Sequence, residues 1–169
     1  MDIQTQRTMI TFKQGGVKFT YRVGGIAIHN GHVLFQKATA DPYQTFWFLP
    51  GGRAELGESA SEGLQREMME ELNLSVTIER PVFLLENFFE SDTMPHHELG
   101  FYFLMQLPLD SYLYWQHGPF VREDEPGLPL IFDWLPLDQL AQLPIKPNFF
   151  RTALQTLPTQ LTHVVHTDN

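Results

Sequence analysis

A run of acidic side chains follows a pair of glycines in the first half of this 169-residue chain. Residues 66–71 read REMMEE and lie inside a predicted helix over Ser59–Leu72. At about 100° per residue, Glu67, Glu70 and Glu71 fall within an arc of roughly 100°. Carboxylates at these spacings repel one another, and a hard cation such as Mg²⁺, which takes oxygen ligands, relieves the repulsion. The three glutamates are therefore candidate metal ligands.

The predicted helix also has an apolar stripe and recognisable ends. Leu64 and Met68 lie beside the acids, so at least one carboxylate is expected at the edge of the core. Ser59 followed by Glu62 is a capping-box pattern, and Asn73 suits a left-handed helix end. An acidic face that simply meets solvent is the alternative, and the helix alone does not decide between the two.

The segment in front of the helix favours a site. Gly51 and Gly52 allow backbone groups to approach a ligand closely. Gly52, five residues, Glu58, seven residues and then REMMEE closely resemble the Nudix box of the MutT-like hydrolases. That family pattern continues with any residue, a glycine and an aliphatic residue. Here Asn73 replaces the glycine, and Asn is the next best residue for a positive φ.

The resemblance implies a fold and a domain plan. The fold expected is α/β (α+β), a mixed β-sheet sandwiched between helices, with the box as a loop–helix–loop. We expect a single domain over residues 1–169, with its core at about 17–157 and a polar, frayed tail over 158–169.

The resemblance also assigns roles by position. Glu67, Glu70 and Glu71 would bind metal, with the carbonyl of Gly51 as a further ligand. Gly52 and Glu58 would be structural, and we expect a polar or ionic contact between Glu58 and Arg66 that holds loop and helix together. The predicted catalytic set is Arg66, Glu67, Glu70 and Glu98.

The implied reaction is hydrolysis of a diphosphate bond. Mg²⁺, with Mn²⁺ as a substitute, would neutralise the diphosphate and lower the pKa of bound water, and a carboxylate would take the proton of that water. Glu67 is the first candidate for this base. Glu98 is the best candidate outside the box, because His96-His97-Glu98 opens a predicted strand over Leu99–Met105. The two histidines are weaker candidates, since adjacent histidines are commonly polar surface.

Several aromatic rings are available to stack on a base. Tyr114 and Trp115 are the preferred candidates, because they lie in a segment between predicted strands. Tyr112 belongs to that same segment. The other rings of interest are more often core residues in β-rich runs; they are Phe46, Trp47, Phe88 and Phe89.

The substrate stays open. ADP-ribose hydrolases of this family often have a proline where Phe89 stands, and diadenosine polyphosphate hydrolases a tyrosine where Ser91 and Asp92 stand. The extended upstream signature of the coenzyme A group is also missing. A nucleoside di- or triphosphate or a nucleotide sugar is favoured. The alternative function is a catalytically silent Nudix-fold module that binds nucleotides as a regulator.

The amino-acid composition limits the classes of molecule that this protein is expected to bind. A net charge of −9 argues against a nucleic-acid polymer or an anionic membrane surface as partner. The chain has no cysteine, which excludes disulfides and thiolate sites. We see neither a signal pattern nor a membrane-spanning apolar run, and we expect a cytoplasmic protein that acts on a small nucleotide-like molecule. Homodimers are common among the relatives.

The remaining elements are predicted from patterning. Asn30-Gly31 predicts a hairpin turn before a strand at His32–Gln36. Lys37–Phe46 and Pro119–Pro129 are predicted loops. Further predicted strands are Val17–Val23, Trp47–Leu49, Ser75–Glu79, Val82–Phe89, Glu98–Gln106 and a final one at Ile131–Leu135, and further helices are Leu137–Leu143 and Pro147–Leu157.

Overall fold

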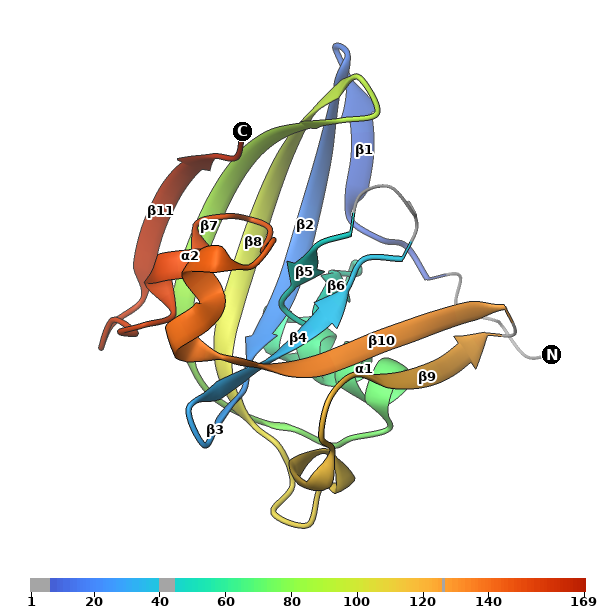
Figure 1. Ribbon diagram of the computed structural model, residues 1–169. Helices are drawn as coiled ribbons and strands as arrows, with labels where there is room; N and C mark the ends of the chain where they lie inside the picture. The colour runs from blue at the N-terminus through green and yellow to red at the C-terminus, as the bar shows by residue number, and fades with distance from the viewer. Residues whose placement is uncertain (1–6, 40–44, 126) are drawn as a thin grey trace, which may run out of the picture.

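The computed structural model describes residues 7–39, 45–125 and 127–169 (Figure 1). Its strands are β1 Thr11–Gln14, β2 Val17–Ile26, β3 Ile28–His29, β4 His32–Lys37, β5 Trp47–Phe48, β6 Gly51–Arg53, β7 Thr77–Ser91, β8 Met94–Gln106, β9 Phe120–Glu125, β10 Leu128–Pro136 and β11 Thr162–Thr167. Its helices are α1 Ala60–Leu72 and α2 Phe150–Ala153, with 3₁₀ helices η1 Tyr112–Trp115 and η2 Leu137–Gln142. The predicted α+β class is confirmed.

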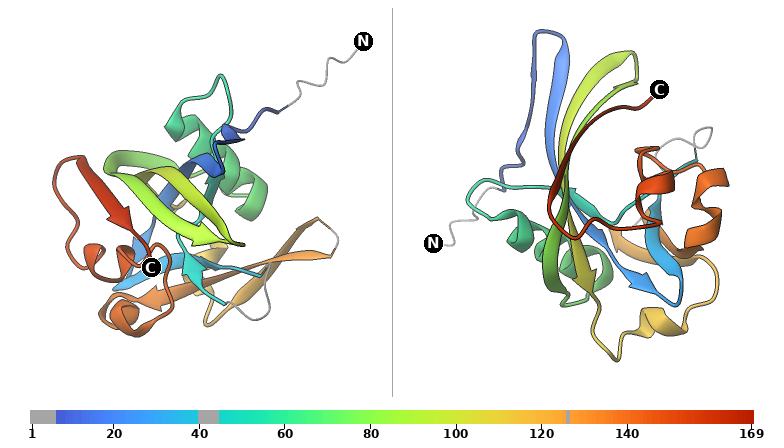
Figure 2. Two further views of the ribbon diagram at one scale, coloured as in Figure 1. Left: turned by 90° about the horizontal axis from the view of Figure 1, so that it is seen from above. Right: turned by 90° about the vertical axis from the view of Figure 1, so that its left-hand side faces the viewer.

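The strands form two sheets. The larger has the order β1-β2-β8-β7-β11, with β6 paired to β2, and the smaller has the order β3-β4-β10-β9, with β5 paired to β4. The larger sheet is mixed, because β2 runs parallel to β8 and β11 parallel to β7 while its other pairs are antiparallel. Helices α1 and α2 lie on opposite sides of the molecule (Figure 2). The β-structure therefore lies between helices, as two sheets.

Two apolar clusters hold these layers together. One surrounds α1, where Leu64, Met68 and Leu72 pack with Val23 of β2 and Phe132 of β10. The other surrounds α2 and contains Ile26, Phe35, Tyr102, Phe150 and Leu154. Strand β2 contributes to both clusters, so its middle is covered on both faces.

The local turn predictions are confirmed. Asn30 and Gly31 have φ angles of 48° and 72°, and Ile28 pairs with Val33 across them. Both central positions need a positive φ in a type I′ turn, which asparagine and glycine tolerate. Of the predicted loop Lys37–Phe46, residues 40–44 lie outside the described part of the chain.

The predicted loop Pro119–Pro129 is wrong. Residues Phe120–Glu125 form β9, which pairs with β10 in an antiparallel hairpin. The acids and prolines suggested a loop, but Phe120 stacks on Phe132 across the pair, with ring centroids 5.7 Å apart. Cross-strand packing of this kind outweighs low strand propensity.

The predicted frayed tail is also wrong. Residues Thr162–Thr167 form β11, which pairs in parallel with β7 from Phe83 to Phe88. Its residues alternate between half-buried and exposed, and it ends at a buried Asp168. The strand was missed because its partner lies about 80 residues earlier, where local patterning gives no signal. Ile131–Leu135, part of β10, is accordingly not the final strand.

Other boundaries change for local reasons. The predicted strands Ser75–Glu79 and Val82–Phe89 merge into β7, which accommodates Pro81 between two register irregularities. The predicted helix Pro147–Leu157 shortens to α2, and Leu137–Leu143 is mostly the 3₁₀ helix η2. Within the described residues, no helix is both long and apolar enough to cross a membrane.

Asp168 anchors β11, and removing its carboxylate should loosen that strand. The Asp168 carboxylate accepts from the backbone N–H of Asn148 at 3.3 Å and from Nζ of Lys146 at 3.2 Å. We expect Asp168→Ala to lower the free energy of unfolding by about 1–3 kcal/mol, because the Asn148 N–H loses its acceptor. Hydrogen exchange should accelerate in β11 first. The exposed Asp138 is the control, and equal effects of Asp138→Ala and Asp168→Ala would contradict the anchoring role.

Candidate active site

Helix α1 begins and ends as its sequence predicts. Ser59 is the N-cap; its Oγ accepts from the N–H of Glu62 at 3.3 Å, and Glu62 Oε2 accepts from the N–H of Ser59 at 2.7 Å. Asn73 closes the helix in the left-handed region at φ 54° and ψ 41°. These caps fix which residues occupy the helix and so which side chains share a face.

One face of α1 is buried, and the acids lie along its edge. Gly63, Leu64, Met68 and Leu72 are buried against the sheets. Glu67, Glu70 and Glu71 are partly buried, as predicted for a stripe next to the core. Burial is the largest influence on the Glu67 carboxyl and raises its pKa, opposed by a hydrogen bond from Arg66. Such a carboxylate gains from a nearby cation.

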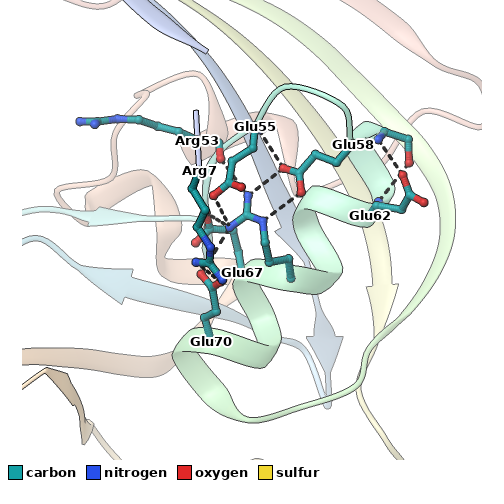
Figure 3. Close-up of polar contacts among 9 residues, drawn as sticks. Arg7, Arg53, Glu55, Glu58, Glu62, Glu67 and Glu70 are labelled. Carbon is teal, nitrogen blue, oxygen red and sulfur yellow. Dashed lines mark hydrogen bonds and ion pairs between the residues drawn. The ribbon is translucent and has the colours of Figure 1, made fainter. Parts of the chain in front are cut away.

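Arg66 is the centre of the polar network around this helix (Figure 3). Its Nε and Nη2 donate to the two oxygens of Glu58 at 2.9 and 2.8 Å, which is the predicted contact in bidentate form. Nη2 also donates to the carbonyl of Arg53 at 3.1 Å. Nη1 donates to Glu67 at 2.9 Å and to Glu70 at 3.3 Å. One guanidinium therefore joins the loop before the helix to two of the candidate metal ligands.

Glu58 completes the loop side of this network. Its Oε1 accepts from the backbone N–H of Glu55 at 2.8 Å, and the hydrogen bond from Arg66 is the main reason why its pKa is lowered. The ionised Glu58 thus closes the turn between β6 and α1.

The glycine pair allows close packing within the protein, while the predicted close approach of its backbone to a ligand stays a prediction. A Cβ at Gly52 would lie 2.2 Å from Cδ of Glu67, and one at Gly51 would lie 2.0 Å from the carbonyl oxygen of Val23. Any side chain at Gly52 would displace the Glu67 carboxylate. Strand β6 can therefore lie directly under the acids of α1 only because both positions lack side chains.

The glutamate carboxylates of α1 are the type of ligand that a divalent cation prefers. Glu67 and Glu70 already contact guanidinium groups, Arg66 in both cases and also Arg7 at Glu70. As the side chains lie, no group of three His, Cys, Asp or Glu side chains converges in metal-binding fashion within the described residues. Oxygen ligands that already gather positive charge at a helix edge fit Mg²⁺ or Mn²⁺. Glu71 and the Gly51 carbonyl stay predicted ligands.

A cavity of about 390 Å³ is lined by residues of β2, β7 and β8 of the larger sheet and by Phe46 and Phe48 from the segment that pairs with the smaller sheet. Arg22 of β2 lines it, donates to the carbonyl of Leu49 at 2.9 Å, and lies 5.1 Å from the ring centre of Phe48. Burial raises the pKa of both Glu67 and Glu98, and the positive charge of Arg22 opposes this rise in each case, so Arg22 lies within electrostatic reach of both carboxyls. Arg22 thereby connects the acids to the cavity.

Glu98 lines this cavity, at a different point of its strand from that predicted. Strand β8 begins at Met94, so Glu98 lies inside the strand, paired with Thr20 and Asn87. Burial raises the pKa of its carboxyl, and Arg22 and Arg53 oppose this. A buried carboxyl beside a cavity is better placed for proton transfer than one at an exposed strand end.

The other candidates lie elsewhere. His96 stacks on Phe89 and His97 on Phe88, with ring centroids 4.7 and 4.5 Å apart, and neither histidine lines the cavity of Glu98. Tyr114 and Trp115 line a separate hollow of about 740 Å³.

The Tyr112–Trp115 segment has structural contacts of its own. The hydroxyls of Tyr112 and Tyr114 donate to the carbonyls of Leu72 and Leu107, and Trp115 is 79% exposed. Of the aromatic candidates, Phe46 and Phe89 line the Glu98 cavity. Sequence reasoning missed Arg22, whose only signal was a cation inside a β-rich run.

A sequence model of the NUDIX domain matches residues 18–156. The low-salt glycan biosynthesis protein Agl8 of Haloferax volcanii is 35% identical to this chain over 63 residues, which cover 37% of this chain and 40% of that protein. The match thus spans less than half of either protein.

Solved structures share the fold at low identity. A Nudix hydrolase from Nitrosomonas europaea has a TM-score of 0.57 at 16% identity, covering 80% of this chain and 86% of that one. The MutT protein of Bacillus halodurans gives 0.53 at 18% identity over 88% and 90%. An ADP-ribose pyrophosphatase from Streptococcus suis gives 0.53 at 15% identity over 87% and 98%.

Loss of the Arg66 guanidinium should destabilise the whole protein. Its side chain is 18% exposed, and its removal would leave the carboxylates of Glu58 and Glu67 without their cationic partner. We expect Arg66→Met to lower the free energy of unfolding, measured with urea, by about 3 kcal/mol. Arg53→Met changes an exposed arginine next to the same loop and should cost less than about 0.5 kcal/mol. Similar costs for both variants would refute a central role for Arg66.

Proposed function

The chain belongs to the Nudix family, and on that basis we propose that it is a metal-dependent hydrolase that cleaves the diphosphate bond of a nucleotide-like substrate. The observation that carries the proposal is the set of carboxylates on α1 that Arg66 organises, together with a cavity whose lining residue Arg22 lies within electrostatic reach of both Glu67 and Glu98. The cluster supplies a place for a cation, and the cavity supplies a place for the rest of the substrate.

The metal ligands proposed are Glu67, Glu70 and Glu71, with the Gly51 carbonyl. A bound Mg²⁺ or Mn²⁺ would contribute charge neutralisation at the diphosphate and a lowered pKa of coordinated water. Arg66 holds Glu67 and Glu70 near each other through its Nη1, and these carboxylates would turn from that contact toward the cation on binding. The Arg22 guanidinium, which lines the cavity and lies within electrostatic reach of Glu67, is suited to a phosphate oxygen.

We propose Glu98, ahead of Glu67, as the general base. The Glu67 carboxylate is engaged by Arg66 and lies against Gly52, which leaves it less free to accept a proton. Glu98 makes no comparable ion pair with any residue that the structure describes, lines the cavity and has a pKa that burial raises. A base is most effective when its pKa lies near the working pH. The water oxygen would bond to phosphorus as its proton passes to Glu98, and the bond from that phosphorus to the bridging oxygen would break, so that the bridging oxygen leaves with the other phosphate-containing product.

A catalytically silent module that binds nucleotides is the second candidate. It keeps the fold and the cavity but releases no product. Turnover that depends on metal separates the two functions, because only the hydrolase needs the cation for chemistry as well as for binding.

Metal-dependent turnover should require Glu70. We expect release of phosphate or nucleotide from a panel of nucleoside di- and triphosphates, nucleotide sugars, dinucleoside polyphosphates and ADP-ribose with Mg²⁺, and none with chelator. Glu70→Gln should lower kcat at least a hundredfold, because one anionic ligand is lost. Glu62→Gln makes the same charge change on the same helix and preserves the capping box, so its activity should match the native protein. Native turnover in Glu70→Gln would refute the ligand assignment, and no turnover of any substrate by the native protein would favour the silent module.

The pH profile should identify the base. A base must be ionised, and burial raises the pKa of Glu98, so kcat/KM should fall as pH drops through a value above the ordinary glutamate pKa of about 4.3. Glu98→Gln should remove that acid limb and lower kcat about 10²–10⁴-fold. Glu86→Gln, on the neighbouring strand β7, should change neither. An acid limb that survives in Glu98→Gln would return the role to Glu67.

A further inference from the structure

Aromatic rings from two separate segments line the cavity beside Glu98. Phe46 and Phe48 line it from the segment that pairs with the smaller sheet, and Phe89 lines it from β7 of the larger sheet. The Phe46 and Phe48 rings are tilted 56° to each other, with centroids 6.2 Å apart. Walls of this kind favour a planar ring over a flexible chain, because a ring gains stacking contact without losing internal freedom.

Asn87 places an amide among these apolar walls. Its side chain lines the same cavity and is 3% exposed, and its Oδ1 accepts no hydrogen bond from any described residue. Asn87 pairs with Glu98 across β7 and β8, so the two side chains emerge on the same face of the sheet. Buried amides nearly always have partners, and one without a partner at a cavity calls for an explanation.

The far side of the cavity is already satisfied within the protein. Lys146 donates to the carboxylate of Asp168 and to the carbonyl of Asn169, and all three residues line the cavity. The Lys146 charge is thus matched by Asp168 and is not left to recruit a phosphate. The Asn87 carboxamide, in contrast, has hydrogen-bonding capacity to offer a ligand.

We propose, resting on the hydrolase function above, that this cavity binds the heterocyclic base of the nucleotide and that Asn87 determines which base is preferred. A carboxamide presents a donor and an acceptor side by side, which matches an adjacent donor and acceptor on the edge of a base. A half-turn of the amide brings either its oxygen or its nitrogen toward the cavity. The base stacks against Phe46, Phe48 and Phe89, and the phosphates extend past Arg22 toward the acids of α1.

Binding measured without metal tests this base pocket separately from catalysis. The four ribonucleoside 5′-monophosphates and ribose 5-phosphate are titrated calorimetrically in the presence of chelator. We expect the nucleotides to bind more tightly than ribose 5-phosphate, with at least a tenfold spread among the bases. Ribose 5-phosphate that binds as tightly as every nucleotide would overturn the base pocket, even if the native protein hydrolyses diphosphates.

Variants on opposite walls should have different effects. Asn87→Leu should weaken the preferred base about tenfold to a hundredfold and remove the preference among bases. Phe46→Leu should weaken all four alike, because stacking on an aromatic ring tolerates any base. Asn87→Asp keeps the shape but loses the donor, so it should shift preference toward bases whose edge offers an amino donor. An unchanged preference in both Asn87 variants would overturn the assignment of Asn87.

Matched controls come from the same protein. Gln36 is also buried, at 5% exposure, with an unpartnered Oε1, but it does not line the cavity. Gln36→Met should leave base preference unchanged, as should Phe12→Leu at an exposed ring on β1. If Gln36→Met erases the preference as fully as Asn87→Leu, the effect arises from loss of a buried amide in general, and the proposal is wrong.

Failure of this inference and failure of the proposed function give different results. Base-selective binding with no turnover of any diphosphate would support the base pocket and refute the hydrolase function. Metal-dependent turnover in which kcat/KM is equal for all four nucleoside triphosphates and is unchanged by Asn87→Leu would support the hydrolase function and refute the base pocket.

Discussion

The bidentate pairing of Arg66 with Glu58 is the interaction on which the candidate active site depends. It joins the helix that carries the acids to the loop that precedes it, and the same guanidinium reaches Glu67 and Glu70. Four glutamates around one arginine would repel each other strongly without it. A planar, permanently charged side chain with several donors in a fixed fork suits this task, and lysine would not replace it.

The position of strand β6 is the second constraint. It lies under α1 because Gly51 and Gly52 have no side chains to collide with Val23 and Glu67. Arg53, one residue on, accepts from Arg66 through its carbonyl, so the backbone of β6 belongs to the same network. The two glycines, the Arg66 guanidinium and the helix caps together hold the carboxylates at the edge of the core. A cation interacts most strongly with carboxylates in such a partly buried position.

Residues far apart in the chain complete the site. Arg22, Asn87 and Glu98 come from β2, β7 and β8, which are neighbours in the larger sheet. Asp168 reaches the cavity because β11 pairs with β7, and Phe48 reaches it from the strand that pairs with β4. The acid helix supplies the proposed metal ligands, while these strands line the cavity and supply the proposed base Glu98, so the candidate site draws on both parts of the fold.

The sequence by itself determined the features that depend on neighbours a few residues apart. The Ser59 cap, the Asn73 end, the Asn30-Gly31 turn, the acids on one helix edge and the Glu58–Arg66 contact all follow from short-range periodicity and sterics. Only the tertiary structure decided the β9–β10 hairpin, the docking of β11 and the lining of the cavity. These depend on pairing between distant strands, and a polar segment such as 162–167 becomes a strand only when a partner such as β7 satisfies its backbone hydrogen bonds.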